Sequence, residues 1–294
     1  MGEKQKLAQT SVGASFILML LKLVFGILTG SLALLSDGIH SALDVTASLI
    51  TWLALRISDR PADAEHNYGH GKVESLSMFG ESILMFLAAC AIGWDAVDSL
   101  LHSAPPPRVS LWALAVVAAA IAIDLWRSRR MAGAAKRYAS PALHADALHF
   151  STDMLISGVV LVSLLAVRLG GAAWSMLDRI GALIVVAVMI GVAFSLARKA
   201  VDVLMDRAPV GSDAALMDRI QVVPGVRGVL RIRVRQSGPQ RFLDATIAVD
   251  PWISMQAGHR IATRVEHAVR DHDPGVDLTV HVEPAATGDP AGRA

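Results

Sequence analysis

The sequence contains few charged and few aromatic residues and a single cysteine. Of its 294 residues, 18% are charged and 5% are aromatic, whereas 53% are hydrophobic; an average soluble domain is about one-quarter charged. One cysteine, Cys90, excludes an internal disulfide framework and a metal site built from several thiolates. A formal net charge of +1 creates no field that would attract nucleic acid. These shortages argue against a soluble enzyme, a disordered chain and a nucleic-acid-binding protein, and they favour a membrane protein.

Two further signatures are missing. The sequence has no Walker-type glycine-rich loop followed by Lys and Ser or Thr, so we expect no bound nucleotide and no step driven by ATP. It also has no His-Glu-x-x-His motif, which argues against a membrane-embedded metallohydrolase. We therefore expect that the protein is not an enzyme.

Six stretches of the chain are long and apolar enough to cross a bilayer. A transmembrane helix needs ~20 mostly apolar residues to cross a core of roughly 30 Å. The first stretch is not followed by a convincing small-residue cleavage site, so we interpret it as a membrane span and not as a signal peptide. The predicted spans lie near residues 9–30, 32–56, 79–102, 109–130, 146–169 and 176–199.

Lysine and arginine gather on one side of these spans. They precede the first span, fill the loops after the second and fourth spans and follow the sixth, whereas the opposite side has almost none. Positively charged loops remain in the cytoplasm. We therefore expect a multi-pass protein of the plasma (inner) membrane with both termini in the cytoplasm.

After about residue 207 the composition becomes that of a small soluble domain. Leu230, Ile232 and Val234 alternate with arginines, which predicts a strand with one solvated face. Together with the following patterns, this gives the order α-β-β-α-β and a small ferredoxin-like or metallochaperone-like α+β domain. The sequence thus predicts an α-helical membrane domain over 1–207, a cytoplasmic αββαβ domain over 208–287 and a flexible tail over 288–294.

The second and fifth spans carry the same motif of ionisable residues. His40 and Asp44 form His-x-x-x-Asp in one span, and His149 and Asp153 form it in the other. At a spacing of four, both side chains share one face of a helix. Ionisable groups at membrane depth are costly and mark transport paths or proton relays. Two imidazoles and two carboxylates supply the four N/O ligands of a tetrahedral Zn²⁺ site and balance the charge of the ion.

Two further groups near these spans have more than one interpretation. Asp37 lies three residues before His40. Its alternative roles are a carboxylate outside the ligand set, a proton acceptor, or a group near the mouth of the transport path. In the loop after the second span, Asp63, His66 and His70 follow the pattern Asp-x-x-His-x-x-x-His. These short spacings can close around one metal ion, and the alternative is a solvated polar loop.

The sequence resembles the cation diffusion facilitator family of divalent-metal/proton antiporters. The resemblance is based on the six spans, the paired motifs, Gly-His-Gly-Lys at 69–72, Arg-Gln-Ser-Gly-Pro at 235–239 and the αββαβ order. It implies an inverted-V homodimer in the lipid bilayer, in which each protomer carries its own transport site. By motif match, that site consists of His40, Asp44, His149 and Asp153.

The resemblance also implies a cargo. Family members with histidine in both motifs resemble zinc transporters, so the expected function is export of Zn²⁺ from the cytoplasm in exchange for protons. Iron, manganese, cobalt, nickel or cadmium are alternative cargoes within the family. The alternative from another class is a membrane-bound metal sensor or scaffold that transports nothing.

Further sites follow from the same resemblance. Relatives carry a second zinc site, with a structural or relay role, in the loop that here holds Asp63, His66 and His70. Lys72 matches a family lysine that pairs with an aspartate after the sixth span, here Asp206, and ties two protomers together.

Relatives also bind metal at the dimer interface of the cytoplasmic domain. Leu230 and Thr246 stand where some of them have histidine, so we expect a weaker site, with an ordinary polar surface as the alternative. Its candidate ligands are Asp244, His259, His281 and Glu283.

Overall fold

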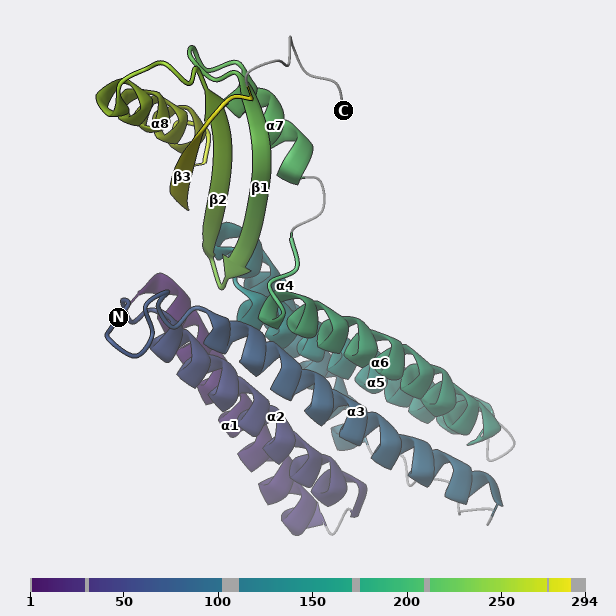
Figure 1. The fold of residues 1–294 in the computed structure, drawn as a ribbon. Coiled ribbons are helices and arrows are strands. Elements are labelled where there is room, and N and C mark those ends of the chain that lie inside the picture. The colour runs from purple at the N-terminus through teal and green to yellow at the C-terminus, as the bar shows by residue number, and fades with distance from the viewer. Residues whose placement is uncertain are drawn as a thin grey trace. The chain divides into compact units, whose positions relative to one another are not determined.

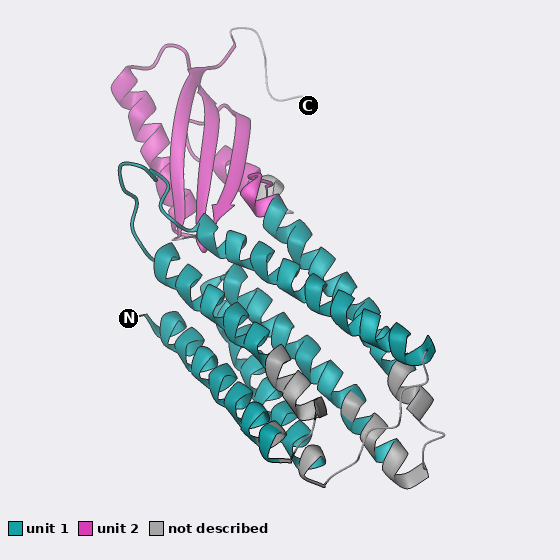
Figure 2. Ribbon diagram, turned by 90° about the horizontal axis from the view of Figure 1, so that it is seen from below, with its two compact units in different colours: residues 1–201 teal, residues 202–294 magenta. Residues whose placement is uncertain are grey.

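Long helices form the first part of the chain, and a small sheet with two helices forms the second (Figure 1). The computed structural model describes residues 2–29, 32–101, 111–170, 175–208, 212–273 and 275–286. Residues 1–201 and 202–294 form two compact units (Figure 2). The boundary falls a few residues before position 207, and α6 runs past it to Leu204.

The first unit contains the six predicted helices. Among the described residues, Glu3–Val24, Lys72–Leu101 and Ile180–Leu204 are each long and apolar enough to cross a membrane. The helices are longer than the apolar spans because their polar ends also continue the helical hydrogen bonding; α3, for example, begins at Lys72. Their bounds are α1 Glu3–Thr29, α2 Leu32–Ser58, α3 Lys72–Leu101, α4 Leu111–Tyr138, α5 Pro141–Gly170 and α6 Ser175–Leu204.

Helix α5 takes part in both apolar cores of this unit. Leu143 and Phe150 pack in one cluster with residues of α1, α2 and α4, such as Leu55. Ala145 packs in the other cluster with residues of α3 and α6, such as Met85. Side chains buried on two sides hold α5 in place, so polar groups on this helix are placed accurately against α2 and α3.

A buried polar junction joins four helices at the end of the unit where α1 begins. Lys4 Nζ of α1 lies 2.6 Å from Asp59 Oδ1 and 3.1 Å from Glu74 Oε1 of α3. Ser58 Oγ of α2 donates to Glu74 at 2.8 Å, and Ser140, just before α5, donates to the same carboxylate. Because Glu74 is fully buried, these donors and the lysine offset the desolvation of its charge.

The second unit has the predicted α-β-β-α-β order. Strands β1 and β2 pair antiparallel, β2 and β3 pair parallel, and the order in the sheet is β1-β2-β3. The fold class expected from the sequence is thereby confirmed. The elements are α7 Ser212–Gln221, β1 Gly228–Ser237, β2 Gln240–Val249, α8 Met255–Arg270 and β3 Val276–Pro284.

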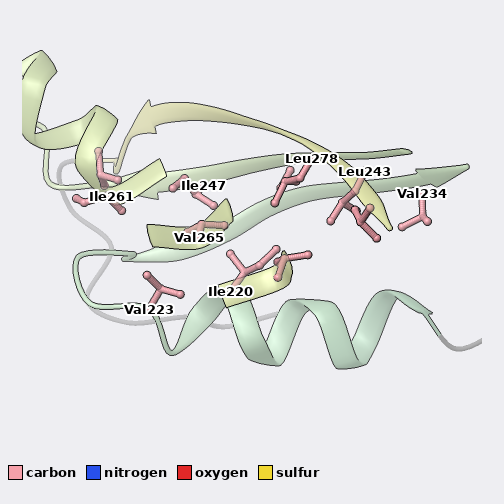
Figure 3. Close-up of a cluster of buried hydrophobic side chains, with 12 residues drawn as sticks. Ile220, Val223, Val234, Leu243, Ile247, Ile261, Val265 and Leu278 are labelled. Carbon is pink, nitrogen blue, oxygen red and sulfur yellow. The ribbon is translucent and has the colours of Figure 1, made fainter. Parts of the chain in front are cut away.

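Both helices of this unit contribute to the core on one face of the sheet (Figure 3). Ile220 of α7 and Val265 of α8 are buried in the same cluster as Ile247 of β2 and Leu278 of β3. The amphipathic pattern of α8, apolar at three- and four-residue intervals, provides its buried stripe. On the other face of the sheet, Arg231 and Arg233 are exposed, as the alternation predicts, whereas Arg235 is half-buried.

The predicted alternation of β1 is wrong at its first residue. Leu230 is 55% exposed, because the pairing register with β2 shifts between Val229 and Arg231. Such a bulge adds one residue to a strand, so the alternation of side chains between the two faces of the sheet shifts by one residue at the bulge. Val229 therefore packs against the core in place of Leu230.

Candidate functional site

Three of the four residues of the paired motifs lie together inside the helical unit. His149 Nε2 of α5 is 3.4 Å from Asp44 Oδ1 of α2 and 3.6 Å from Asp153 Oδ2, one turn further along α5. Each residue offers one ligand atom, and all three atoms lie within 4.8 Å of one another. This spacing fits ligands that surround one small cation, since ligand atoms about 2 Å from a metal are themselves 3 to 4 Å apart.

The three side chains are almost completely shielded from solvent. Their exposed fractions are 16% for Asp44, 8% for His149 and 13% for Asp153. Phe150 packs edge-on against the imidazole, with a distance of 5.6 Å between ring centroids. Two carboxylates and one imidazole in such a dry place attract a cation strongly. The dielectric constant there is lower than that of water, so their electrostatic attraction to the cation is screened less.

The remaining residues of this prediction lie where side chains are not described. His40 and Asp37 belong to α2, but their side chains fall outside the described part of the structure. The backbone places His40 one helical turn before Asp44, so both residues belong to the same face of α2.

Besides Glu74, sequence reasoning did not single out four other buried ionisable residues in the same helical unit. They come from α3, α4 and α5, and each is at most 8% exposed. The signal that could have identified them is the same one that identified the motifs, a charged residue inside or at the edge of an apolar span. These residues are Glu81, Asp124, Arg127 and Asp146.

Arg127 of α4 is held by serines from two other helices. Its Nη2 donates to Ser15 Oγ at 2.5 Å and to Ser11 Oγ at 2.9 Å, both on α1, and to Ser48 Oγ of α2 at 3.3 Å. A guanidinium carries five donors in a fixed fork, so it can bind several oxygens at once. Arg127 thereby connects three helices around one buried charge.

The same guanidinium also reaches α5 beside the candidate ligands. Its Cζ lies 3.4 Å from the centroid of the Phe150 ring, which is a cation–π distance. Its Nη1 lies 3.5 Å from Asp124 Oδ1, one turn earlier on α4. Arg127 therefore packs against the ring of Phe150, the residue next to His149.

The loop residues Asp63, His66 and His70 form the second group of candidate ligands. His66 Nδ1 lies 3.2 Å from Asp63 Oδ1, and His70 Nε2 lies 3.4 Å from Asp63 Oδ2. The imidazole centroids are 4.4 Å apart, and the three ligand atoms are mutually within 4.8 Å. Gly69 has φ of +73°, a conformation that glycine adopts at little cost, and this turn brings His70 back toward His66.

Asp63 is prepared as an anion before any ligand arrives. The backbone N–H of His66 donates to Asp63 Oδ1 at 2.7 Å, and that of Glu65 donates to the same oxygen at 3.0 Å. These hydrogen bonds, with that from the His66 ring, hold the pKa of the Asp63 carboxyl below its ordinary value. The carboxylate consequently persists at acidic pH, below the range in which a typical aspartate takes up a proton.

The candidates in the cytoplasmic domain do not form one group within a protomer. His281 Nε2 lies 3.4 Å from Glu283 Oε1 on β3, and Asp244 belongs to the same exposed face of the sheet through its register with Thr279. His259 is on α8, which packs against the opposite face. Among the described residues, no set of three ligands forms there.

The predicted charge pair joins residues of different units. Lys72 begins α3 in the first unit, and Asp206 follows α6 in the second. Within its own unit, Asp206 Oδ2 lies 3.9 Å from Arg235 Nη1. The pairing of Lys72 with Asp206 stays a prediction.

Two family models match most of the chain. Residues 8–205 match the cation efflux transmembrane domain, and residues 212–285 match the cytoplasmic domain of cation efflux proteins. The chain belongs to the cation efflux family. It is a membrane protein and a transporter of the kind that exports divalent metal ions, and not an enzyme. Its cytoplasmic domain is the dimerisation domain of the family, consistent with a homodimer.

Two relatives match this chain along nearly its whole length, and one solved structure matches a part of it. The chain is 33% identical over 292 residues to the cation-efflux pump FieF of Serratia proteamaculans (strain 568), covering 98% of this chain and 94% of that protein. It is 32% identical over 290 residues to FieF of Pectobacterium atrosepticum, covering 95% of this chain and 92% of the relative. A solved MamM CTD structure is 32% identical, covers 24% of this chain and 90% of its own, and gives a TM-score of 0.23.

Proposed function

We propose that this cation efflux protein is a proton-coupled antiporter that exports Zn²⁺ from the cytoplasm. The cluster of Asp44, His149 and Asp153, buried within a membrane domain, is the observation that carries the proposal. His40 completes the set as the fourth ligand, from the same face of α2 as Asp44. Asp37, one turn further back, is a carboxylate outside this set.

The chemistry of the ligands favours Zn²⁺. Zinc takes four ligands in a tetrahedral arrangement and accepts both imidazole nitrogen and carboxylate oxygen. Two carboxylates neutralise its double charge, which permits a dehydrated ion at membrane depth. Imidazole suits zinc better than the harder ions, which prefer ligand sets made of oxygen alone. Manganese is therefore expected to bind least well, and cobalt and nickel to compete most.

Proton exchange follows from the same ligands. An imidazole must be neutral and a carboxylate ionised to bind a metal, so metal binding releases protons and protons displace metal. As pH falls on the receiving side, metal affinity falls there as well. The positive-inside asymmetry of the loops places the ends of the chain in the cytoplasm, so that export runs from the side of the termini to the opposite side.

The decisive measurement is metal flux in proteoliposomes with a pH-sensitive dye inside. We expect Zn²⁺ to drive proton movement in the opposite direction, with smaller signals for Fe²⁺, Mn²⁺, Co²⁺, Ni²⁺ and Cd²⁺. A larger signal for another ion would show that Zn²⁺ is not the preferred cargo, and the proposed proton antiport would still stand. Metal binding without any flux would overturn the proposal in favour of a sensor or scaffold.

We also propose that Asp63, His66 and His70 bind a second zinc ion in the loop. The ion would hold the loop closed beside the start of α3. Asp63→Ala removes the only carboxylate of the group, and we expect zinc affinity at this site to fall roughly tenfold or more, since changes outside a metal's own ligands already have effects of this size. Titration calorimetry on the full-length protein measures it, with Asp218→Ala, a change of an exposed aspartate on α7, as a variant outside the group. An unchanged number of bound zinc ions, with unchanged affinities, in Asp63→Ala would contradict the site.

For the cytoplasmic domain we propose a weak site on the exposed face of the sheet. Asp244, His281 and Glu283 would contribute to it together with the same face of a second protomer. His259 would join only from the partner, since α8 covers the other face of its own sheet. Such a site could favour one arrangement of the dimer only as far as it binds metal more tightly in that arrangement.

A further inference from the structure

Glu81 of α3 is a buried carboxyl group that the metal site does not use. It is 1% exposed. Its Oε1 accepts hydrogen bonds from Thr51 of α2 and, at 3.4 Å, from Ser77 Oγ of α3 itself. Its Oε2 is buried and has no hydrogen-bond partner among the described residues. A carboxyl group with one free oxygen away from water is a place where a proton can reside.

The position of Glu81 lies between the transport site and the end of the bundle where α1 begins. Glu74 and Glu81 are seven residues apart on α3, and their hydroxyl partners Ser58 and Thr51 are seven residues apart on α2. Two helical turns correspond to a rise of about 10 Å. A further step of seven residues along α2 leads to Asp44. Glu81 therefore occupies the level between the Lys4–Glu74 junction and the candidate ligands.

The charges around Glu81 come from α5. Asp146 and His149 are within electrostatic range of its carboxyl group. Helix α2 presents the Thr51 hydroxyl and α3 the Ser77 hydroxyl. In the described part of the chain, Glu81 forms no ion pair with a lysine or arginine, and the charged groups with the largest effect on it are those of α5.

The other buried acids of this unit have a cation close by. Lys4 pairs with Glu74 at 3.1 Å, and Arg127 pairs with Asp124 at 3.5 Å. Asp146 lies within electrostatic range of Arg127, although neither of its buried carboxylate oxygens has a hydrogen-bond partner among the described residues. An ionised carboxylate without such a partner is strongly disfavoured away from water. Among these acids, Glu81 is thus the one that has no lysine or arginine as its partner in the described part of the chain.

We propose that Glu81 is a proton-binding site of the transporter, separate from the metal ligands, and that its proton leaves when metal occupies the neighbouring site. This inference depends on the transport site proposed above. Metal binding adds two positive charges to the site, and the protons displaced from the ligands remove only part of that added charge. The site is then less negative than it was without metal, which disfavours the proton on Glu81; this proton passes to bulk water and leaves a carboxylate behind.

The first test counts the protons released per zinc ion bound, with purified full-length protein in weak buffer containing a pH indicator. We expect Glu81→Gln to bind zinc and release fewer protons per ion, by about one, while Glu81→Asp retains most of the release. Glu266→Gln, the same change on α8, serves as the matched control and is expected to match the wild type. An unchanged count in Glu81→Gln, or a loss that appears in Asp146→Asn but not in Glu81→Gln, would overturn the proposal.

The second test observes the protonated carboxyl group directly by infrared spectroscopy. Infrared difference spectra taken on adding zinc are expected to show the loss of a C=O stretching band of a protonated carboxyl group, and this band is expected to be missing from spectra of Glu81→Gln. If the wild-type difference spectrum lacks this band, or if Glu81→Gln shows it at the same strength, Glu81 loses no proton when zinc binds and the proposal is refuted. If wild-type protein binds zinc at Asp44 and Asp153 without proton-coupled flux, the proposed function fails instead, which the flux assay reports separately.

Discussion

Zinc flux is expected to fall by about 100-fold or more when Asp153 is replaced by alanine. The substitution removes one of the two carboxylates that balance the double charge of the ion, and His149 Nε2 loses its neighbour at 3.6 Å. Even changes outside the ligands of a metal cost about 10- to 100-fold, so the loss of a ligand has at least that effect. The measurement is zinc-driven proton flux in proteoliposomes, with zinc affinity determined on the same preparation.

A matched control for this experiment is Asp218→Ala on α7. Asp218 is exposed in the second unit, so the same chemical change there is expected to leave flux and affinity near those of the wild type. Wild-type flux in Asp153→Ala, with zinc still bound at full affinity, would show that the cluster of Asp44, His149 and Asp153 does not carry the transported ion. A folded variant with neither flux nor high-affinity binding would support the site.

The motif residues of the candidate site could be predicted from the sequence because their geometry is local. A spacing of four on a helix places His149 and Asp153 on one face whatever the rest of the chain does. Asp44 was found by the repetition of the motif in α2. The same reasoning predicted the α-β-β-α-β order of the second unit, whose patterns of period two and 3.6 are also local.

The surroundings of the site depend on contacts that no local pattern contains. Arg127 binds Ser11, which is 116 residues away in the sequence, and Glu81 meets Thr51 only because α3 packs beside α2. The side of the sheet that α8 covers is likewise set by tertiary packing, and it separates His259 from His281. Single charged residues in apolar spans were visible in the sequence, but their partners were not.

Arg127 is the residue whose loss we expect to destabilise the helical unit most. Its guanidinium donates to Ser11, Ser15 and Ser48 and lies over the ring of Phe150. Arg127→Met preserves much of the apolar volume but leaves the buried carboxylate of Asp124 without its cation. Breaking a buried ion pair on one side costs about 3–5 kcal/mol, which is a large share of the stability of a typical domain.

The measurement is thermal unfolding of the detergent-solubilised protein, and Arg130→Met on the same helix is the matched control. Arg130 is exposed, and its Cζ lies 5.2 Å from the centroid of the Trp126 ring, so its loss is expected to shift the melting temperature little. Arg127→Lys keeps a charge but lacks the planar fork that reaches several oxygens at once, and we expect an intermediate shift. If Arg127→Met melts at the same temperature as Arg130→Met, the contacts of the guanidinium with the serines, Asp124 and Phe150 do not stabilise the helical unit, and the prediction is wrong. In the expected case, the same charge that holds α1, α2, α4 and α5 together also fixes Phe150 beside His149, so that stability and the geometry of the metal ligands depend on one buried cation.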